Sequence, residues 1–332
     1  MKKSYIILVV VLGILGFIFL RDGGGPYLEQ NLNALNEDND GKIVSTETID
    51  VLAWNEKIEN NKQFDNEKEK RLLKEFEEKI KKIDTHSVNY LSEGREAKAL
   101  IMKSKEKGNY PVLFFNVSAQ IKDWKNKKIA HYWFASLFSE DYIIVAPKYE
   151  GDYGGKQLED FSAADSEQFL DLVKLTKSLP YVNENKMAAI GIEKGGQMVY
   201  QAIKNDVELN AAAVFNTPTD LIDLYNDSIS ARKKVFEKKL GGSPSEVEEK
   251  YIAKSPYYWP EKIDIPLLIL HHKEAKNVKA VQSRKLVDKF NEISYKDYKA
   301  VINSNSEMVW DHSIEWIKDK TDIPLEMQGE SL

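Results

Sequence analysis

The chain has 332 residues, enough for one large α/β domain with attachments or for two ordinary domains. Its formal net charge is −6 and no basic stripe is present, which argues against nucleic-acid binding because phosphates require clustered Lys and Arg. The chain contains no cysteine, which excludes disulfides, thiolate nucleophiles and cysteine-based metal sites.

The N-terminus has the pattern of a membrane-targeting segment. Two lysines at residues 2–3 precede an uncharged apolar run over residues 5–20. No small-residue cleavage motif follows, so we interpret residues 1–21 as a membrane anchor in preference to a cleaved signal. The positive-inside rule then places the bulk of the chain outside the cytoplasm, in a periplasm or at a cell surface, or free in the medium if the segment is cleaved. Residues 22–26 form a glycine-rich flexible spacer.

A calcium-loop pattern follows the spacer, within a helical extension predicted over residues 27–85. The ligand positions of an EF-hand-like loop fall on Asn36, Asp38, Asp40, Lys42 (through its backbone carbonyl) and Glu47, with Gly41 at the sharp turn. The uncharged first position and Val44 at the ninth weaken this set. We therefore expect a weak, structural Ca²⁺ site ahead of a helix from Thr48 to Ile58, the alternative being a solvated Asx-rich turn. No organic cofactor is expected.

An amphipathic helix is predicted over Asn66 to Ile83. Its apolar face contains Leu72, Leu73, Phe76 and Ile80, and its other faces are charged. Docking of this helix on its own domain is favoured, and a partner-binding helix is the alternative.

Apolar runs and helical patterns then alternate, as in a parallel sheet with crossover helices. A hairpin over His86–Leu91 and Ala97–Lys103 leads into strands predicted over Pro111–Val117, Tyr142–Pro147, Met187–Ile192, Ala211–Asn216 and Pro266–His271. Helices are expected near Lys128–Phe138, Ala163–Leu179, Gly195–Asn205 and Val278–Phe290. The fold class is therefore α/β, with a doubly wound, mostly parallel sheet over residues 86–325. A charged insertion at about 221–259 interrupts the alternation and is expected to form a helical cap, and residues 326–332 form a tail.

The sequence from 186 to 200 has the pattern of a nucleophile elbow. An apolar strand runs into the turn Gly191-Ile-Glu193-Lys-Gly-Gly196 and then into a helix. Small residues around such a turn relieve crowding and project the apical side chain above the sheet. A G-x-S-x-G elbow has serine at the apex, whereas this chain has Glu193.

Several stretches in order resemble the α/β-hydrolase domain of the prolyl oligopeptidase family of serine peptidases. They are Tyr110–Asn116, Tyr142–Pro147 with Tyr149 and Gly151, Phe161–Asp165, Leu179–Asn185, Pro218–Asp220, Ser255–Pro260 and Ile265–His271. The resemblance implies an α/β-hydrolase fold from about residue 86 to residue 318. It also implies a ligand pocket that includes Glu193, Lys194, Asn116, Val117 and Tyr149.

The same resemblance implies a Ser-His-Asp triad, and all three of its positions are altered. Glu193 replaces the serine, Ala275 stands where the aspartate is expected, and residues 273–311 contain no histidine. A carboxylate at the apex would repel the developing oxyanion and, without a base, would leave an anhydride unhydrolysed.

The sequence therefore favours a membrane-tethered pseudoenzyme that binds an unknown peptide, small-molecule or protein ligand. A working hydrolase with a relocated catalytic set is one alternative, built from Ser118 or Ser162 with His271, His272 or His312. A structural scaffold is another. His271 and His272 are interpreted as packing or hydrogen-bonding residues, and His312 as the residue that opens a C-terminal helix over Ser313–Lys318.

Overall fold

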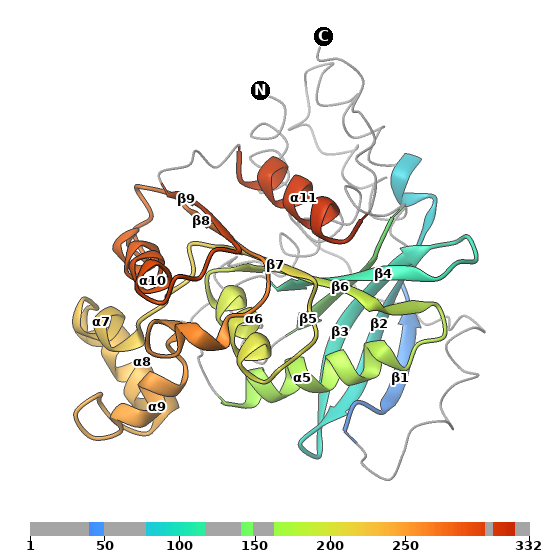
Figure 1. The fold of residues 1–332 in the computed structure, drawn as a ribbon. Helices are drawn as coiled ribbons and strands as arrows, with labels where there is room; N and C mark the ends of the chain where they lie inside the picture. Colours follow the sequence, from blue (N-terminus) through green and yellow to red (C-terminus); the bar gives the residue numbers. More distant parts are fainter. Residues whose placement is uncertain (1–39, 50–77, 117–140, 149–162, 303–307, 323–332) are drawn as a thin grey trace, which may run out of the picture.

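The computed structural model describes residues 40–49, 78–116, 141–148, 163–302 and 308–322. The described residues contain a nine-stranded sheet in the order β1-β2-β3-β5-β4-β6-β7-β8-β9, with helices on both faces (Figure 1). The predicted α/β fold with a mostly parallel sheet is therefore confirmed.

The antiparallel part of the sheet lies at one end. It comprises β1 (Ile43–Thr48), β2 (Ile83–Ser92) and β3 (Arg95–Ser104), and β3 pairs with β5 (Ile143–Lys148). The predicted hairpin corresponds to β2 and β3.

The remaining strand pairs are parallel. They join β5, β4 (Tyr110–Asn116), β6 (Val182–Ile192), β7 (Ala211–Phe215), β8 (Leu267–His271) and β9 (Tyr298–Ile302). Because the strands are parallel, Asn116, Glu193, Asn216 and His272 all lie where strands end, at one carboxyl edge of the sheet.

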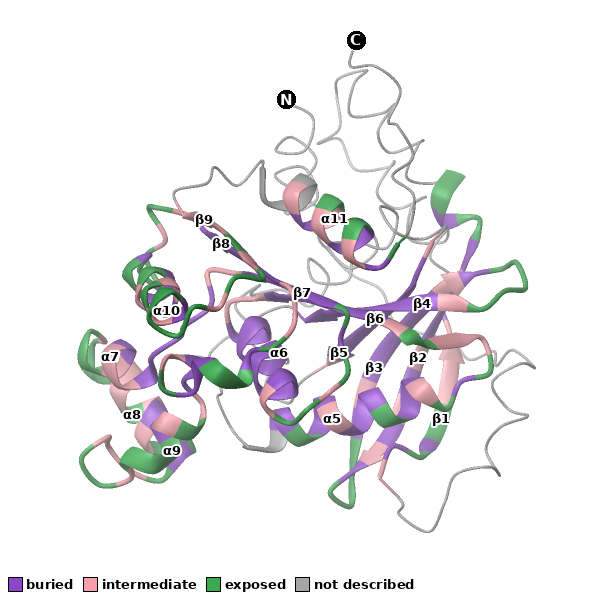
Figure 2. Ribbon diagram, viewed as in Figure 1, coloured by how far each residue is buried: buried purple, intermediate pink, exposed green. Residues whose placement is uncertain are grey.

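Helices cover the two faces of the sheet. Helices α5 (Ala163–Lys177), α6 (Lys194–Lys204) and α10 (Val281–Glu292) pack on one face, and α11 (Met308–Lys320) packs on the other (Figure 1). Alternate residues of β4 show why both faces are apolar: Val112 and Phe114 enter the first core, and Leu113 and Phe115 enter the second. The middle parts of the central strands are buried, including Met187–Gly191 of β6 (Figure 2).

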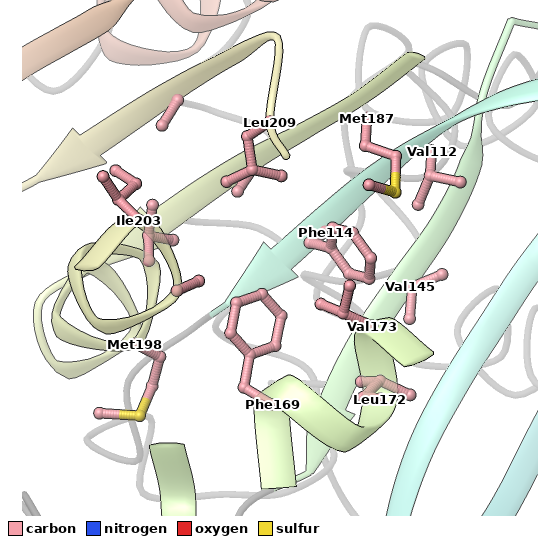
Figure 3. Packing of buried hydrophobic residues seen from close by; sticks show 14 of the residues in the cluster. Val112, Phe114, Val145, Phe169, Leu172, Val173, Met187, Met198, Ile203 and Leu209 are labelled. Atoms are coloured by element: carbon pink, nitrogen blue, oxygen red, sulfur yellow. The ribbon is translucent and has the colours of Figure 1, made fainter. Parts of the chain in front are cut away.

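The larger core is closely packed around the two central helices. The rings of Phe114 and Phe169 meet edge to face, with centroids 5.4 Å apart, and Met187, Met198 and Ile203 surround them (Figure 3). This packing fixes α6 against β4 and β6 and so fixes the turn between β6 and α6.

The insertion between β7 and β8 is helical, as expected. It contains α7 (Leu221–Asn226), α8 (Ser230–Leu240), α9 (Glu248–Ala253) and the short 3₁₀ helices Pro256–Tyr258 and Pro260–Lys262. The helices enclose a small core of their own, formed by Leu221, Leu224, Phe236, Leu240 and Tyr251.

The start of this insertion is fastened to α10, and its end is fastened to its start. The amides of Thr219 and Asp220 donate to Oε1 of Gln282 at 2.9 and 2.8 Å, and Tyr257 N–H donates to the Thr219 carbonyl. Lys285 of α10 pairs with Asp220 at 2.6 Å. The insertion is therefore held against the main domain by buried polar contacts.

The structure corrects the expected helical extension where it is described. Residues 43–48, placed in the calcium loop and at the start of a helix, form edge strand β1, in which Glu47 pairs with Ser87 of β2. The Lys42 carbonyl accepts the Leu91 N–H at 2.9 Å, so it serves the sheet. In an EF-hand a helix follows the loop from its twelfth position. Glu47 occupies that position but lies in a strand, so the predicted EF-hand geometry is wrong here.

Three further elements differ from the prediction. Ile83, expected to end the helix from Asn66, is the first residue of β2. Strand β9 was not predicted, and α11 begins at Met308, so His312 lies within this helix and does not open it. Across the described segments, no helix is long and apolar enough to cross a membrane, and residues 5–20 lie outside those segments.

Gly41 sets the approach of the N-terminal strand to the domain. Its φ is +83°, and a Cβ at this position would lie 3.1 Å from the Asp171 carbonyl oxygen on α5. Its N–H donates to the Leu91 carbonyl at 2.8 Å. The turn before β1 therefore needs glycine for its backbone conformation and for the close contact with α5.

We expect Gly41→Ala to lower the free energy of unfolding by more than Gly94→Ala. Both positions have positive φ, which costs an L-residue about 1–2 kcal/mol, but a Cβ at Gly94 has nothing within 4 Å. Denaturant unfolding of the two variants measures the difference. Equal losses would contradict the close packing of this turn on α5.

Candidate functional site

The turn between β6 and α6 has the backbone geometry of a nucleophile elbow. Its apex, Glu193, has φ 51° and ψ −114°, a conformation that costs energy for a side chain other than glycine. A Cβ on Gly191 would overlap the Cα of Gly196, and one on Gly196 would overlap the Thr217 side chain. The two glycines thus permit a contact that no other residue allows.

Neighbouring backbone holds the apex in place. The Glu193 N–H donates to the Phe215 carbonyl of β7 at 2.8 Å, and the Gly196 N–H donates back to the Glu193 carbonyl at 3.1 Å. Glu193 is half-buried and precedes the first turn of α6, whose amides carry partial positive charge. Its carboxylate is therefore placed at the carboxyl edge of the sheet, where its charge is favoured.

The residue after the apex forms a buried ion pair. Nζ of Lys194 lies 2.5 Å from Oδ2 of Asp165 on α5, and both side chains are at most 2% exposed. Lys194 was predicted to line the pocket, but its side chain is directed toward α5. A cation at a helix N-terminus interacts unfavourably with the helix dipole, and burial adds a desolvation cost. The carboxylate of Asp165 compensates the charge of Lys194 at this position.

Polar residues end the strands beside the elbow. Asn116 is fully buried at the end of β4 and is in register with Gly191. Asn216, with φ 47°, follows β7 and accepts the His272 N–H through Oδ1 at 2.9 Å. The carboxyl edge next to Glu193 therefore carries amides, which can donate to or accept from a ligand.

His271 is committed to the interior, as the sequence indicated. Its Nε2 lies 2.8 Å from the Val278 carbonyl and its Nδ1 lies 2.7 Å from Oγ of Ser283. Since a carbonyl only accepts, Nε2 carries the proton and the Ser283 hydroxyl donates to Nδ1. Burial lowers the pKa of His271, which favours this neutral form.

The position of the expected acid lies in the turn after β8. The Ala275 N–H donates to the His272 carbonyl at 3.1 Å, and the Glu274 N–H donates to Nδ1 of His272 at the same distance. The turn is thus closed by backbone and by the His272 ring, and Ala275 brings no carboxylate to it.

His312 lies on α11, and its buried Nδ1 has no hydrogen-bond partner among the residues that the structure describes. The other end of α11 is tied to the amino edge of the sheet, through Lys318 to Asp141 at 2.5 Å and through Thr321 to Tyr142. His312 therefore lies on the half of α11 that is closer to the carboxyl edge.

Several predicted residues lie outside the described segments. They are Val117 and Tyr149 of the expected pocket, the candidate serines Ser118 and Ser162, and the calcium-loop residues Asn36 and Asp38. Within the described segments, no group of three or more Asp, Glu or His residues could hold a metal ion. Calcium binding by this stretch stays a prediction, without the EF-hand geometry.

A model of the prolyl oligopeptidase family matches residues 130–320. The chain belongs to this family. It is 26% identical over 212 residues to the uncharacterized peptidase YtmA of Bacillus subtilis, an alignment that covers 64% of this chain and 81% of YtmA. It is 25% identical over 177 residues to dipeptidyl-peptidase 5 of Porphyromonas endodontalis, covering 47% of this chain and 24% of that protein.

The family fold also appears in solved structures. Acylaminoacyl peptidase from Pyrococcus horikoshii superimposes with a TM-score of 0.61 at 18% sequence identity, over 75% of this chain and 44% of that one. A puromycin-hydrolyzing peptidase of Mycobacterium tuberculosis superimposes with a TM-score of 0.57 at 16% identity, over 72% and 40%. The chain thus spans less than half the length of these prolyl-oligopeptidase-fold enzymes.

Sequence reasoning missed one feature of this family member's elbow, the ion pair between Lys194 and Asp165. A lysine inside an otherwise small and apolar helix start was the available signal, because a buried lysine needs an acid. Asp165 was noted only as part of a motif, since nothing in the spacing shows that α5 and α6 meet there.

We expect Lys194→Met to lower the free energy of unfolding by about 3–5 kcal/mol, because it leaves Asp165 buried without compensation. The double variant Lys194→Met/Asp165→Leu should recover most of this loss. Denaturant unfolding measures both, and Arg95→Met, which breaks the exposed pair with Glu93, should change stability far less. If the double variant is no more stable than Lys194→Met, the uncompensated charge of Asp165 is not the reason for the loss of stability.

We also expect the free energy of unfolding to decrease as the pH is lowered, because His271 is buried in its neutral form. Burial holds the pKa of folded His271 below its ordinary value of 6.5, so between pH 7 and 5 the unfolded chain binds a proton that the folded chain resists. The loss approaches about 1.4 kcal/mol per pH unit below the unfolded pKa. Chemical unfolding at several pH values should show a shallower decrease for His271→Gln. Parallel curves would show that His271 does not contribute.

Proposed function

We propose that this chain is a pseudoenzyme of the prolyl oligopeptidase family that binds a ligand at the carboxyl edge of its sheet. The observation that carries the proposal is Glu193 at the apex of an intact elbow. The apex conformation presents a carboxylate where a peptidase needs a neutral hydroxyl, and its negative charge opposes an oxyanion. The ligand is a peptide, a small molecule or a protein segment.

The surroundings of the elbow support binding over catalysis. His271 and His272 both use their Nδ1 atoms in local hydrogen bonds, and residues 273–311 contain no histidine. A general base must reach the proton that it removes, and neither ring is free to turn toward Glu193 without breaking these bonds. The elbow geometry persists as a scaffold for recognition.

The proposal includes a location. Residues 5–20 would hold the domain at the membrane on its extracytoplasmic side, with residues 22–39 as the connection to the turn before β1. A scaffold that docks partners through the helix predicted from Asn66 onward would be compatible with this location. It predicts that a partner is lost when Leu73 and Phe76 become polar.

One observation favours a second candidate, a hydrolase with a relocated base. Nδ1 of His312 is buried on the half of α11 closer to the carboxyl edge, and no group in the described part of the chain bonds to it. An unpaired buried nitrogen is costly and is often retained for a function. In this alternative His312 activates a nucleophile such as Ser118 or Ser162.

Labelling with a fluorophosphonate separates the two candidates. We expect no labelling of the wild-type chain and none of Glu193→Ser, because a serine without a base remains a weakly nucleophilic alcohol. Intact mass measurement gives the stoichiometry, and YtmA labelled in parallel shows that the probe is active if it proves to be a serine hydrolase.

Stoichiometric labelling of the wild-type chain would refute the pseudoenzyme proposal. If that labelling disappears in His312→Gln, the relocated base is identified. Labelling of Glu193→Ser alone would show that a base already faces the apex and that only the nucleophile has been lost.

A further inference from the structure

The connection between α7 and α8 and the turn after β8 meet on the outside of the domain. Oδ2 of Asp227 lies 2.7 Å from Nζ of Lys279, and Nη1 of Arg232 donates to the Asn277 carbonyl at 2.6 Å. These two contacts place the start of α8 next to residues 273–281, although some fifty positions separate them in the sequence.

Two exposed apolar side chains stand at this junction. Ile229 is 74% exposed, the highest value among the exposed large hydrophobic residues described, and Val281 is 44% exposed. The inner side of α8 is already occupied, because Phe236 and Leu240 pack into the core of the insertion. Ile229 therefore has no place in a core of the described domain and projects from the connection between two helices.

Positive charge predominates in the two segments next to these apolar residues. Residues 227–240 contain five basic and two acidic residues, and residues 273–279 contain three basic and one acidic residue, in a chain whose net charge is −6. Arg232 and Lys239 are seven positions apart on α8 and so lie on one stripe. Of the acids, Asp227 pairs with Lys279 and Glu237 accepts the Tyr225 hydroxyl at 2.5 Å.

We define the basic face as Ile229, Arg232, Lys239, Lys276, Lys279 and Val281, and we propose that it binds the surface of an anionic lipid bilayer. Basic residues around protruding apolar ones are the composition of interfacial membrane contacts. A bilayer accepts a protruding Ile229 without a matching pocket, whereas a protein partner must supply one. This inference rests on the proposed membrane location.

The basic face and the predicted membrane anchor would together orient the domain on the bilayer. It adjoins β8, near one end of the sheet, and the chain enters the domain at β1, the strand at the other end. Contact at both ends holds the sheet in one orientation to the bilayer, which a single flexible connection cannot do. The carboxyl edge that carries Glu193 then faces a fixed direction.

The absence of cysteine makes a direct test possible. The full chain carrying Ile229→Cys, labelled with an environment-sensitive dye, is reconstituted into vesicles of phosphatidylcholine alone or mixed with phosphatidylglycerol. We expect a blue shift and a rise in emission with the mixed vesicles only, reversed by added salt because exposed charges are screened. The same dye at Ile293→Cys, 43% exposed and at the end of α10 away from Val281, should not respond.

Matched charge reversals complete the test. Lys239→Glu/Lys276→Glu should abolish the shift, and Lys105→Glu/Lys107→Glu, in the exposed turn between β3 and β4, should leave it unchanged. Equal dye emission in both kinds of vesicle would overturn the proposal. So would a shift caused by soluble polyglutamate and not by vesicles, which would indicate an acidic protein partner.

The experiment also distinguishes failure of the proposed N-terminal anchor from failure of lipid binding by the basic face. If residues 5–20 do not anchor the chain, it fails to float with neutral vesicles, and mixed vesicles added to the free chain then test the basic face alone. No dye response to those added vesicles would overturn the proposal.

Discussion

The rest of the site depends on a backbone contact that only glycine permits, where β6 turns into α6. A Cβ on Gly191 would overlap the Cα of Gly196, and a Cβ on Gly196 would overlap the Thr217 side chain, so strand, helix and the following loop can approach this closely only with glycine at both positions. This contact forces Glu193 into its positive-φ conformation. The geometry of the elbow is therefore set by its glycines and is independent of the residue at the apex.

That independence explains how a family fold can retain its elbow while its chemistry changes. The apex conformation is stabilised by hydrogen bonds to Phe215 and Gly196 backbone, and the first helical residue is fixed by the ion pair with Asp165. None of these interactions involves the apical side chain. A substitution there changes the charge presented to a ligand and leaves the scaffold unaltered.

The sequence predicted the parallel core well and its edges poorly. Buried central strands such as β4 are continuous apolar runs bounded by turn residues, and the glycine spacing identified the elbow, so both follow from local pattern. β1 reads Ile-Val-Ser-Thr-Glu-Thr, and its polar residues matched a calcium loop because only pairing with β2 makes it a strand. The partner of Lys194 was equally unpredictable, since Asp165 reaches it through the packing of two helices.

The place of β1 has a consequence for the order in which the domain folds. This strand is synthesised before every other strand of the described sheet, and its neighbour there is β2, which is itself held by β3 and, through β3, by β5. β1 must therefore wait until later parts of the chain have formed a template, and it joins by a long-range contact that is slow to close. An edge strand added late contributes little to the rate of folding, and its detachment is a local opening that leaves the rest of the sheet paired.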